Sequence, residues 1–314
     1  MTDTTIRTEP ALTVADLRSP PRQVRKEEAI RWLLLGAAFF SVVVSVLIVF
    51  SLIREAWTFI SQVEWASLWT DGWFPRRGIY DIKTLVVASL IVTIVGLAIA
   101  VPVGLGGAIY LSEYARPKVR RVLKPTLEIL AGIPSVVVGF FALTFIAPEI
   151  IQNVFEGSPQ QTMLAAGIGV GVLIIPLIAS ISEDAMRSVP QTLRDASYGL
   201  GAKKVTTVVK VVLPAAVSGL VAAFIVGFSR AIGETMVVFI AAGRTGGSIF
   251  QVHPLEGGLT MTAGMASIAA GTDRVVGEDL TFQSLFFVGL LLFAVTLTLN
   301  LVADRFVRRV RRRY

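Results

Sequence analysis

Six long stretches of the sequence are free or nearly free of charge, and they restrict the possible folds more than any other feature. Each is close to the roughly 20 helical residues that cross a bilayer core. They are Trp32–Ile53, Thr84–Ser112, Ile129–Pro148, Gln160–Ser182, Val211–Ala242 and Leu280–Ala303. With 54% hydrophobic residues, the chain exceeds what a soluble core needs. The sequence therefore predicts an all-α, polytopic membrane bundle of six transmembrane helices.

The lysines and arginines outside these stretches predict how the bundle is oriented. Six lie in the N-terminal tail, five between Glu113 and Lys124, five between Arg187 and Lys210, and six in the C-terminal tail. The alternate loops hold six between them. Because cytoplasmic loops carry the excess of these residues, both termini are predicted to be cytoplasmic. The predicted organisation is a tail over residues 1–31, a six-helix domain over 32–303 and a basic tail over 304–314, with residues 1–21 disordered.

Charge and cysteine content exclude several function classes. The net charge of +7 is spread over four short loops, so it reflects topology rather than nucleic-acid binding. The chain has no cysteine, which excludes disulfides and thiolate metal sites. His253 is the only histidine and cannot build a metal site or a catalytic triad alone. No cofactor is expected.

Two loops on the outer side have a predicted structure. The loop from Arg54 to Lys83 contains four tryptophans, a residue type enriched at membrane interfaces. The segment Leu259–Ala270 is apolar but too short to span. It is interpreted as a re-entrant or interfacial helix buried against protein, where its polar ends are satisfied.

The segment 183–214 is polar and predicts two short helices joined by a turn. Ser188 and Gln191 have the spacing of a capping box. Gly201 then allows a left-handed turn that other residues resist. A second helix follows, and Pro214 is expected to close it. Helical periodicity alone leaves two interpretations open, an interfacial connector and a docking element for a partner.

The spacing within this segment resembles a known motif. Asp195-Ala196-Ser197, then Gly201, then Val211-Val212-Leu213-Pro214 is similar to the "EAA" loop of ABC importer permeases, E-A-A-x3-G-x9-I-x-L-P. The chain departs from it by Asp for Glu, Ser for Ala and Val for Ile. The resemblance implies a type I ABC importer permease (MetI-like) fold. It also implies that Asp195, Ala196, Gly201, Leu213 and Pro214 couple the chain to an ATP-hydrolysing subunit.

The chain itself lacks the phosphate-binding loop G-x-x-x-x-G-K-[ST]. ATP is therefore expected to bind another polypeptide, and this chain is predicted to be a transporter subunit and not an enzyme. An intramembrane enzyme would need a convergent nucleophile and base, and a non-transporting scaffold would not need the ordered docking loop. These are the alternatives from other functional classes.

Two charged residues lie within the fifth stretch, in the sequence "SRAIGETM". Arg230 and Glu234 are spaced i, i+4 and are expected on one helical face near mid-membrane. One interpretation is a buried ion pair that sets helix register. The other is an anion path, because the arginine fork suits a tetrahedral oxyanion. Glu234 would accept a hydrogen bond from a protonated oxyanion, which favours phosphate over sulfate.

A narrower resemblance covers most of the chain, from about Ile79 to Asn300. The stretches Tyr110–Leu143 and Gly227–Val238, with "GIPSVV" and "RAIGETM", resemble PstC-type permeases of the phosphate-specific ABC importer. The resemblance implies translocation of inorganic phosphate across a bacterial plasma membrane. It implies as partners a PstA-type sister permease, ATP-binding cassette subunits and an extracytoplasmic phosphate-binding protein. Arg244 departs from the uncharged segment expected there. A permease for sulfate, molybdate or phosphonate is the alternative within this class.

The third stretch contains Pro134 and Ser135. The proline is expected to free a backbone carbonyl inside the span, and Ser135 either bridges it, meets the ligand, or simply packs at a kink. Near the cytoplasmic end, Glu128 is expected to pair with Lys124 or Arg121.

Overall fold

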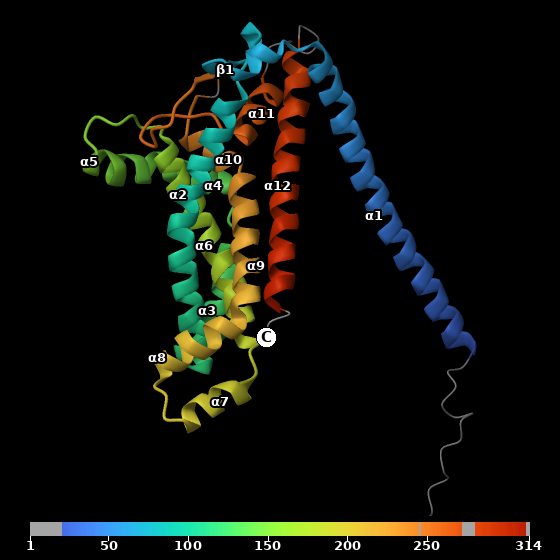
Figure 1. Cartoon of the computed structure of the whole chain (residues 1–314), viewed down its shortest axis with the longest axis vertical. Helices are drawn as coiled ribbons and strands as arrows, with labels where there is room; N and C mark the ends of the chain where they lie inside the picture. Colours follow the sequence, from blue (N-terminus) through green and yellow to red (C-terminus); the bar gives the residue numbers. More distant parts are fainter. Residues whose placement is uncertain (1–20, 245, 272–279, 312–314) are drawn as a thin grey trace, which may run out of the picture. The chain divides into compact units, whose positions relative to one another are not determined.

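The computed structural model describes residues 21–244, 246–271 and 280–311 of the chain (Figure 1). The chain divides into two compact units, Met1–Ser51 and Leu52–Tyr314. Helix α1 (Pro21–Gln62) supplies the described part of the first unit and the beginning of the second. The predicted disordered tail falls almost wholly outside the described residues. Residues 21–31 of the predicted N-terminal tail are helical, and of these only residue 21 was predicted to be disordered.

Within the part of the chain that the structure describes, six helices are long and apolar enough to span a membrane, as the sequence predicts. They are Lys26–Gln62, Ile82–Tyr114, Ser135–Val154, Met163–Arg187, Lys204–Ile232 and Thr281–Arg305. The count and order agree with the prediction, and the boundaries shift by up to several residues. The largest shift is in the fifth span, which ends at Ile232 rather than Ala242.

Three helices form the centre of the second unit: α2 (Ile82–Ile109), α6 (Met163–Arg187) and α9 (Leu213–Ile232). Helix α6 lies against both of the others (Figure 1). Small residues allow this close packing. A Cβ added at Gly171 of α6 would lie 2.9 Å from the carbonyl oxygen of Gly96 in α2. One added at Gly219 of α9 would lie 2.4 Å from Cβ of Ala185 in α6.

The remaining helices of the second unit lie around this centre or at its ends. They are α3 (Pro117–Leu130), α4 (Ser135–Phe141), α5 (Gln152–Val154), α7 (Gln191–Gly199), α8 (Lys204–Thr207), α10 (Met236–Ala241), α11 (Met261–Ala269) and α12 (Thr281–Arg311). The π-helical segments η3 (Tyr110–Tyr114), η4 (Ala142–Ile151) and η5 (Val208–Val212) continue α2, α4 and α8. Helix α12 packs against α9 and α11, and α10 packs against α4 and α6. Because α12 runs to Arg311, the described part of the predicted C-terminal tail, from residue 304, is helical.

A small antiparallel sheet, which the sequence did not predict, lies in the loops that the charge pattern assigns to the outer side. Its order is β2–β1–β3, formed by β1 (Gly72–Phe74), β2 (Ile79–Tyr80) and β3 (Ser248–Ile249). The 3₁₀ turns η1 (Trp65–Trp69) and η2 (Pro75–Arg77) flank it. Strands of two or three residues are too short to show the alternating pattern that identifies a strand.

Of the four outer-loop tryptophans, three are exposed as an interfacial belt requires, namely Trp57, Trp65 and Trp69. Trp73 instead is 1% exposed and meets Tyr80 edge-on in the core. The predicted short helix after Leu259 is confirmed as α11. The threonine before it, Thr260, accepts a hydrogen bond from the amide of Ala263 and so caps the helix.

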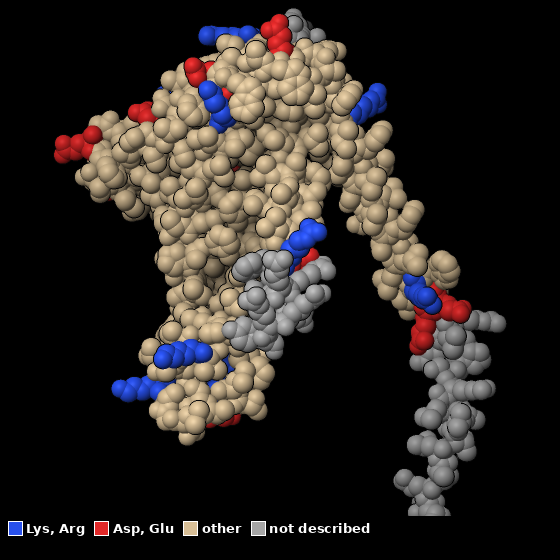
Figure 2. All heavy atoms as spheres, viewed as in Figure 1, with Lys and Arg blue, Asp and Glu red and all other residues tan. Residues whose placement is uncertain are grey.

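The two ends of the second unit differ in composition from its middle. The sheet and α11 lie at one end, and α7, α8 and the C-terminal end of α12 at the other (Figure 1). In the space-filling view, charged side chains gather mainly near these ends, with a broad and mostly uncharged band between them (Figure 2). This is the distribution expected of a membrane-spanning bundle.

Candidate coupling and transport sites

The helix pair predicted in segment 183–214 is present at the end of the bundle. Helix α7 ends at Gly199, and Gly201 adopts φ +79°, the left-handed conformation that the sequence predicts. Helix α8 then begins at Lys204. The hydroxyls of Ser197 in α7 and Thr207 in α8 lie 2.9 Å apart, so a hydrogen bond holds the two helices together.

The predicted capping box does not form. Ser188 ends α6, where its hydroxyl donates to the carbonyl of Ala185 instead of capping α7. The residue before α7 is Pro190, which leaves the start of α7 without a side-chain cap. Gln191 donates to the carboxylate of Asp195 at 3.1 Å. Because α6 extends to Arg187, the connection that leads into α7 begins only at Ser188.

Pro214 does not close the second helix, contrary to the sequence prediction. The helix runs without interruption from Lys204 to Ile232. A proline has no N–H and its ring clashes with the carbonyl four residues earlier. The π-helical segment η5 provides the adjustment: the amide of Leu213 donates to the carbonyl of Val208, five residues back.

The helix pair exposes apolar side chains at its end. Leu200 is 90% exposed and Val205 is 62% exposed, and Leu193 and Tyr198 are also exposed. Asp195 and Ala196 lie on the exposed part of α7, whereas Leu213 and Pro214 are half-buried. Of the five predicted coupling residues, three therefore lie at the exposed end of the bundle, and Leu213 and Pro214 lie where the helix enters it. An exposed apolar group of this kind marks an interaction surface.

Two buried charge clusters hold this end of the bundle together, and the sequence analysis identified neither. Arg194 of α7 is 7% exposed and forms an ion pair of 2.9 Å with Glu113 of η3. Glu183 of α6 is fully buried and receives Arg120 at 2.7 Å and Lys124 at 2.8 Å. The partners are 59 to 81 residues apart, so no local spacing reveals them.

The second cluster corrects an expectation for α3. Lys124 pairs with Glu183 and Asp184, both in α6, and not with Glu128. Partial burial lowers the pKa of Lys124, but its hydrogen bonds to Asp184 and Glu183 raise the pKa further, so it lies above its ordinary value. Through these two contacts Lys124 joins α3 to α6.

The fifth span is interrupted where the sequence placed the candidate transport residues. Helix α9 ends at Ile232, and α10 begins at Met236. Arg230 is in the last turn of α9 and is exposed, whereas Glu234 lies in the interruption and is 8% exposed. The expectation of one shared helical face is therefore wrong, because Gly233 ends the helix between them. No ion pair joins them within the described residues.

Glu234 is held by the elements around the interruption. Its carboxylate accepts a 3.5 Å hydrogen bond from the amide of Val237 in α10. Its carbonyl accepts a hydrogen bond of 2.7 Å from the hydroxyl of Thr262 in α11. Nearby, the hydroxyl of Ser229 donates to Asn300 of α12 at 3.1 Å. Arg230 has none of these contacts, and its guanidinium is accessible from outside the single chain.

Ser135 is the first residue of α4 and is half-buried. Pro134 precedes the helix as its N-cap residue, so the predicted kink inside the third span is instead the boundary between α3 and α4. A proline disfavours the helical conformation in the residue before it, which separates the two helices. Helix α4 packs closely on α10, because a Cβ at Gly139 would lie 3.1 Å from the carbonyl of Met236.

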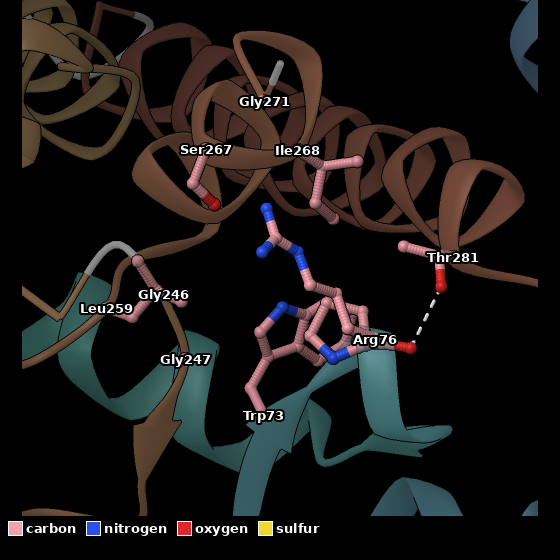
Figure 3. A pocket seen from close by; sticks show the side chains of 10 residues that line it. Trp73, Arg76, Gly246, Gly247, Leu259, Ser267, Ile268, Gly271 and Thr281 are labelled. Carbon is pink, nitrogen blue, oxygen red and sulfur yellow. Dashed lines mark hydrogen bonds between the residues drawn. The ribbon is translucent and has the colours of Figure 1, made fainter. Parts of the chain in front are cut away.

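Described residues line two hollows near the end of the bundle that holds the sheet. One has a volume of about 400 Å³, and its polar lining includes Gln160, Gln161, Arg244 and Glu256. Arg244 has φ +64°, an uncommon conformation for a non-glycine residue. The other is only about 40 Å³, and Arg76 points into it towards Ser267 and Ile268 (Figure 3). That volume suits a few water molecules rather than a transported solute.

A bundle of spanning helices that presents an exposed helix pair at one end is the arrangement expected of a transporter's membrane component. Residues 100–314 match the family described as "Binding-protein-dependent transport system inner membrane component". The chain belongs to this family. It is therefore a multi-pass membrane component of a transport system that depends on a binding protein, and not a catalytic subunit.

Individual relatives of the chain have more specific names than the family does. The chain is 35% identical over 264 residues to the phosphate transport system permease protein PstC 1 of Mycobacterium tuberculosis (strain H37Rv), with 77% of each chain covered. It is 29% identical to PstC of Pasteurella multocida, covering 88% of this chain and 90% of that one. It is 38% identical to the probable ABC transporter permease protein YqgH of Bacillus subtilis, over 65% of this chain and 63% of that one.

Solved structures share the fold. A chain of the bacterial alginate ABC transporter superposes with a TM-score of 0.65 at 14% identity, covering 92% of this chain and 97% of that one. A chain of the MetNI methionine ABC transporter gives a TM-score of 0.51 at 22% identity, covering 73% and 93%. At these identities the likeness establishes the fold alone, and it agrees with the MetI-like architecture expected from the sequence.

Proposed function

We propose that the chain translocates inorganic phosphate, as the permeases PstC 1 and PstC are named for doing. The supporting observation is Arg230, an exposed arginine where a spanning helix ends inside the bundle. It lies sixteen residues beyond Pro214, or about 24 Å along a helix that rises 1.5 Å per residue. Because a charge at this depth is costly, it is expected to face a cavity or a path.

The path is formed with a second permease. Arg230 is exposed in the single chain, and so are Val137 and Phe140 of α4, which packs beside α10. A sister subunit of the PstA type that covers Arg230 would enclose it in a shared path. Its guanidinium then donates to the oxygens of phosphate. Ser135 and Glu234 lie on neighbouring elements, and the Glu234 carboxylate would accept a hydrogen bond from the protonated oxygen of the anion.

Energy comes from ATPase subunits docked on α7 and α8 in the cytoplasm. The exposed Leu200 and Val205 supply apolar contact area, and Asp195 supplies a carboxylate for a basic partner group. Gly201 sets the angle between the helices through its left-handed turn. At the outer end, an extracytoplasmic phosphate-binding protein delivers the ion, with both termini of the chain cytoplasmic in a bacterial plasma membrane.

Uptake measurements test the proposal. The complete complex is reconstituted in proteoliposomes that contain ATP, and labelled phosphate, sulfate and molybdate are supplied with the binding protein. Phosphate uptake that depends on ATP, with little uptake of the other two ions, is the expected result. Uptake of sulfate or molybdate in preference to phosphate would instead assign the chain to another oxyanion.

A further inference from the structure

Arg194 binds three separate parts of the chain from a single buried position. Its Nη2 donates to Oε1 of Glu113 at 2.9 Å and to the carbonyl of Met186 at 2.9 Å. Its Nη1 donates to the carbonyl of Val189 at 2.7 Å, and its Nε approaches Oε2 of Glu113 at 3.4 Å. Met186 is in the last turn of α6, and Val189 lies just beyond it. One guanidinium therefore joins α7 to η3 and to the end of α6.

Glu113 is equally enclosed. Its side chain is 4% exposed, and it also accepts a hydrogen bond of 2.8 Å from the hydroxyl of Ser112. Beside it, the ammonium of Lys204 in α8 lies 4.8 Å from the ring centre of Tyr114. Because η3 continues α2, a pull on Glu113 acts directly on the second spanning helix.

The chemistry of the pair indicates a positional role. Removing two charges from water is costly, and apolar residues of similar volume commonly give equal or greater stability. A two-point contact between arginine and carboxylate, however, fixes direction as well as distance. Among the described residues, Arg194 provides every side-chain hydrogen bond that joins α7 to an element preceding it in the chain. The Ser197–Thr207 contact joins α7 only to α8.

We propose that Arg194 is the positioning residue through which displacement of α7 moves α2 and α6 together. The proposal rests on the proposed function, because it takes a docked ATPase as the source of that displacement. Without Arg194, α7 remains joined to α6 through residues 188–190 and to α8, but it loses its direct side-chain link to η3 and so to α2. ATP hydrolysis then continues while the transport path responds incompletely.

The first test compares ATP hydrolysis and uptake in the reconstituted complex. Arg194→Ala and Glu113→Ala should each raise the ATP consumed per ion imported by at least about fivefold, the lower end of typical coupling between sites. The double variant should be no worse than either single variant, because both remove one contact. Arg194→Lys should be intermediate, since lysine keeps the charge without the fork. Arg116→Ala, an exposed arginine at the start of α3, is the matched control.

The second test needs no transported ion. Because the chain lacks cysteine, spin labels on Thr192→Cys in α7 and Val103→Cys in α2 are its only labelled sites. In the complex, the distance between them should stay constant between the nucleotide-free and ATP-bound states. Addition of Arg194→Ala should make that distance depend on nucleotide. A distance unaffected by Arg194→Ala, or an unchanged ratio of ATP to ion, overturns the proposal. If the ion is not phosphate, only the uptake proposal fails.

Discussion

The hydroxyl of Thr262 donates a 2.7 Å hydrogen bond to the main-chain carbonyl of Glu234, at the point where the fifth spanning helix is interrupted. The same end of α11 is bound to α2, because the amide of Met261 donates to the hydroxyl of Ser89 at 2.9 Å. An interrupted helix leaves carbonyls without intrahelical partners, and the bilayer offers none. Helix α11 therefore stabilises the interruption beside Arg230.

Removal of this hydroxyl should weaken the interruption. Thr262→Val preserves the side-chain shape and leaves the buried carbonyl without its partner, at a cost of about 1–3 kcal/mol. We expect a lower midpoint in thermal unfolding of the purified protein and reduced uptake. Thr144→Val is the matched control, because the Thr144 hydroxyl donates to the Phe140 carbonyl at 2.7 Å on an exposed surface. Equal midpoints for the two variants would show that the Thr262 contact is not important.

Arg230→Ala should abolish phosphate uptake while the permease still assembles with the ATPase. The reason is that the guanidinium is the proposed donor to the anion, and it has no ion pair within the described residues whose loss would unfold the helix. Uptake of labelled phosphate and co-purification of the ATPase measure the two effects. Arg54→Ala, an exposed arginine in α1, should leave both unchanged. Normal uptake by Arg230→Ala would exclude this residue from the path.

Gly201→Val should uncouple ATP hydrolysis from transport. The turn at Gly201 has φ +79° with no neighbouring atom within 4 Å of an added Cβ, so the penalty is one of backbone conformation. For L-residues it is about 1–2 kcal/mol. Gly199 offers a close comparison, because it has equal space but lies within α7 without a positive φ. ATP consumed per imported ion should rise for Gly201→Val and stay normal for Gly199→Val; similar values for both would refute the turn argument.

Glu183→Gln should destabilise the end of the bundle near α3. The substitution removes the charge that Arg120 and Lys124 share. Breaking a fully buried pair costs about 3–5 kcal/mol, and the cost here should be smaller because both cations are partly in water. The thermal midpoint of Glu183→Gln should fall below that of Asp184→Asn, whose carboxylate is 61% exposed. The reverse order would show that the buried carboxylate contributes less than the exposed one.

The sequence predicted those features that depend on local composition. The number of spans follows from the length of the continuous apolar stretches. The turn at Gly201 follows from glycine, the residue type that most readily adopts a left-handed backbone. Features that depend on distant partners were missed. The interruption after Ile232 has only a glycine as a local signal, and its stabilising partner, Thr262, comes 28 residues after Glu234. The Arg194–Glu113 pair likewise joins distant segments. The basic residues of these segments were counted only to predict on which side of the membrane each loop lies.

The prediction that Pro214 ends the second helix was also wrong. Proline commonly ends a helix, but a π-helical segment can absorb the missing hydrogen bond, and η5 does so here. At Pro134 the sequence predicted a kink within one continuous span, and this prediction was wrong as well. There the backbone breaks into two helices, and no π-helical segment bridges α3 and α4.

The uninterrupted helix from Lys204 to Ile232 has a mechanical consequence. Its 29 residues extend about 44 Å at 1.5 Å per residue, so a tilt of about 5° at one end swings the other through about 4 Å. Leu200 and Arg230 lie close to its opposite ends. If α7 and α8 rock against a docked partner, this helix would carry the displacement to the depth of Arg230, where the anion is proposed to cross.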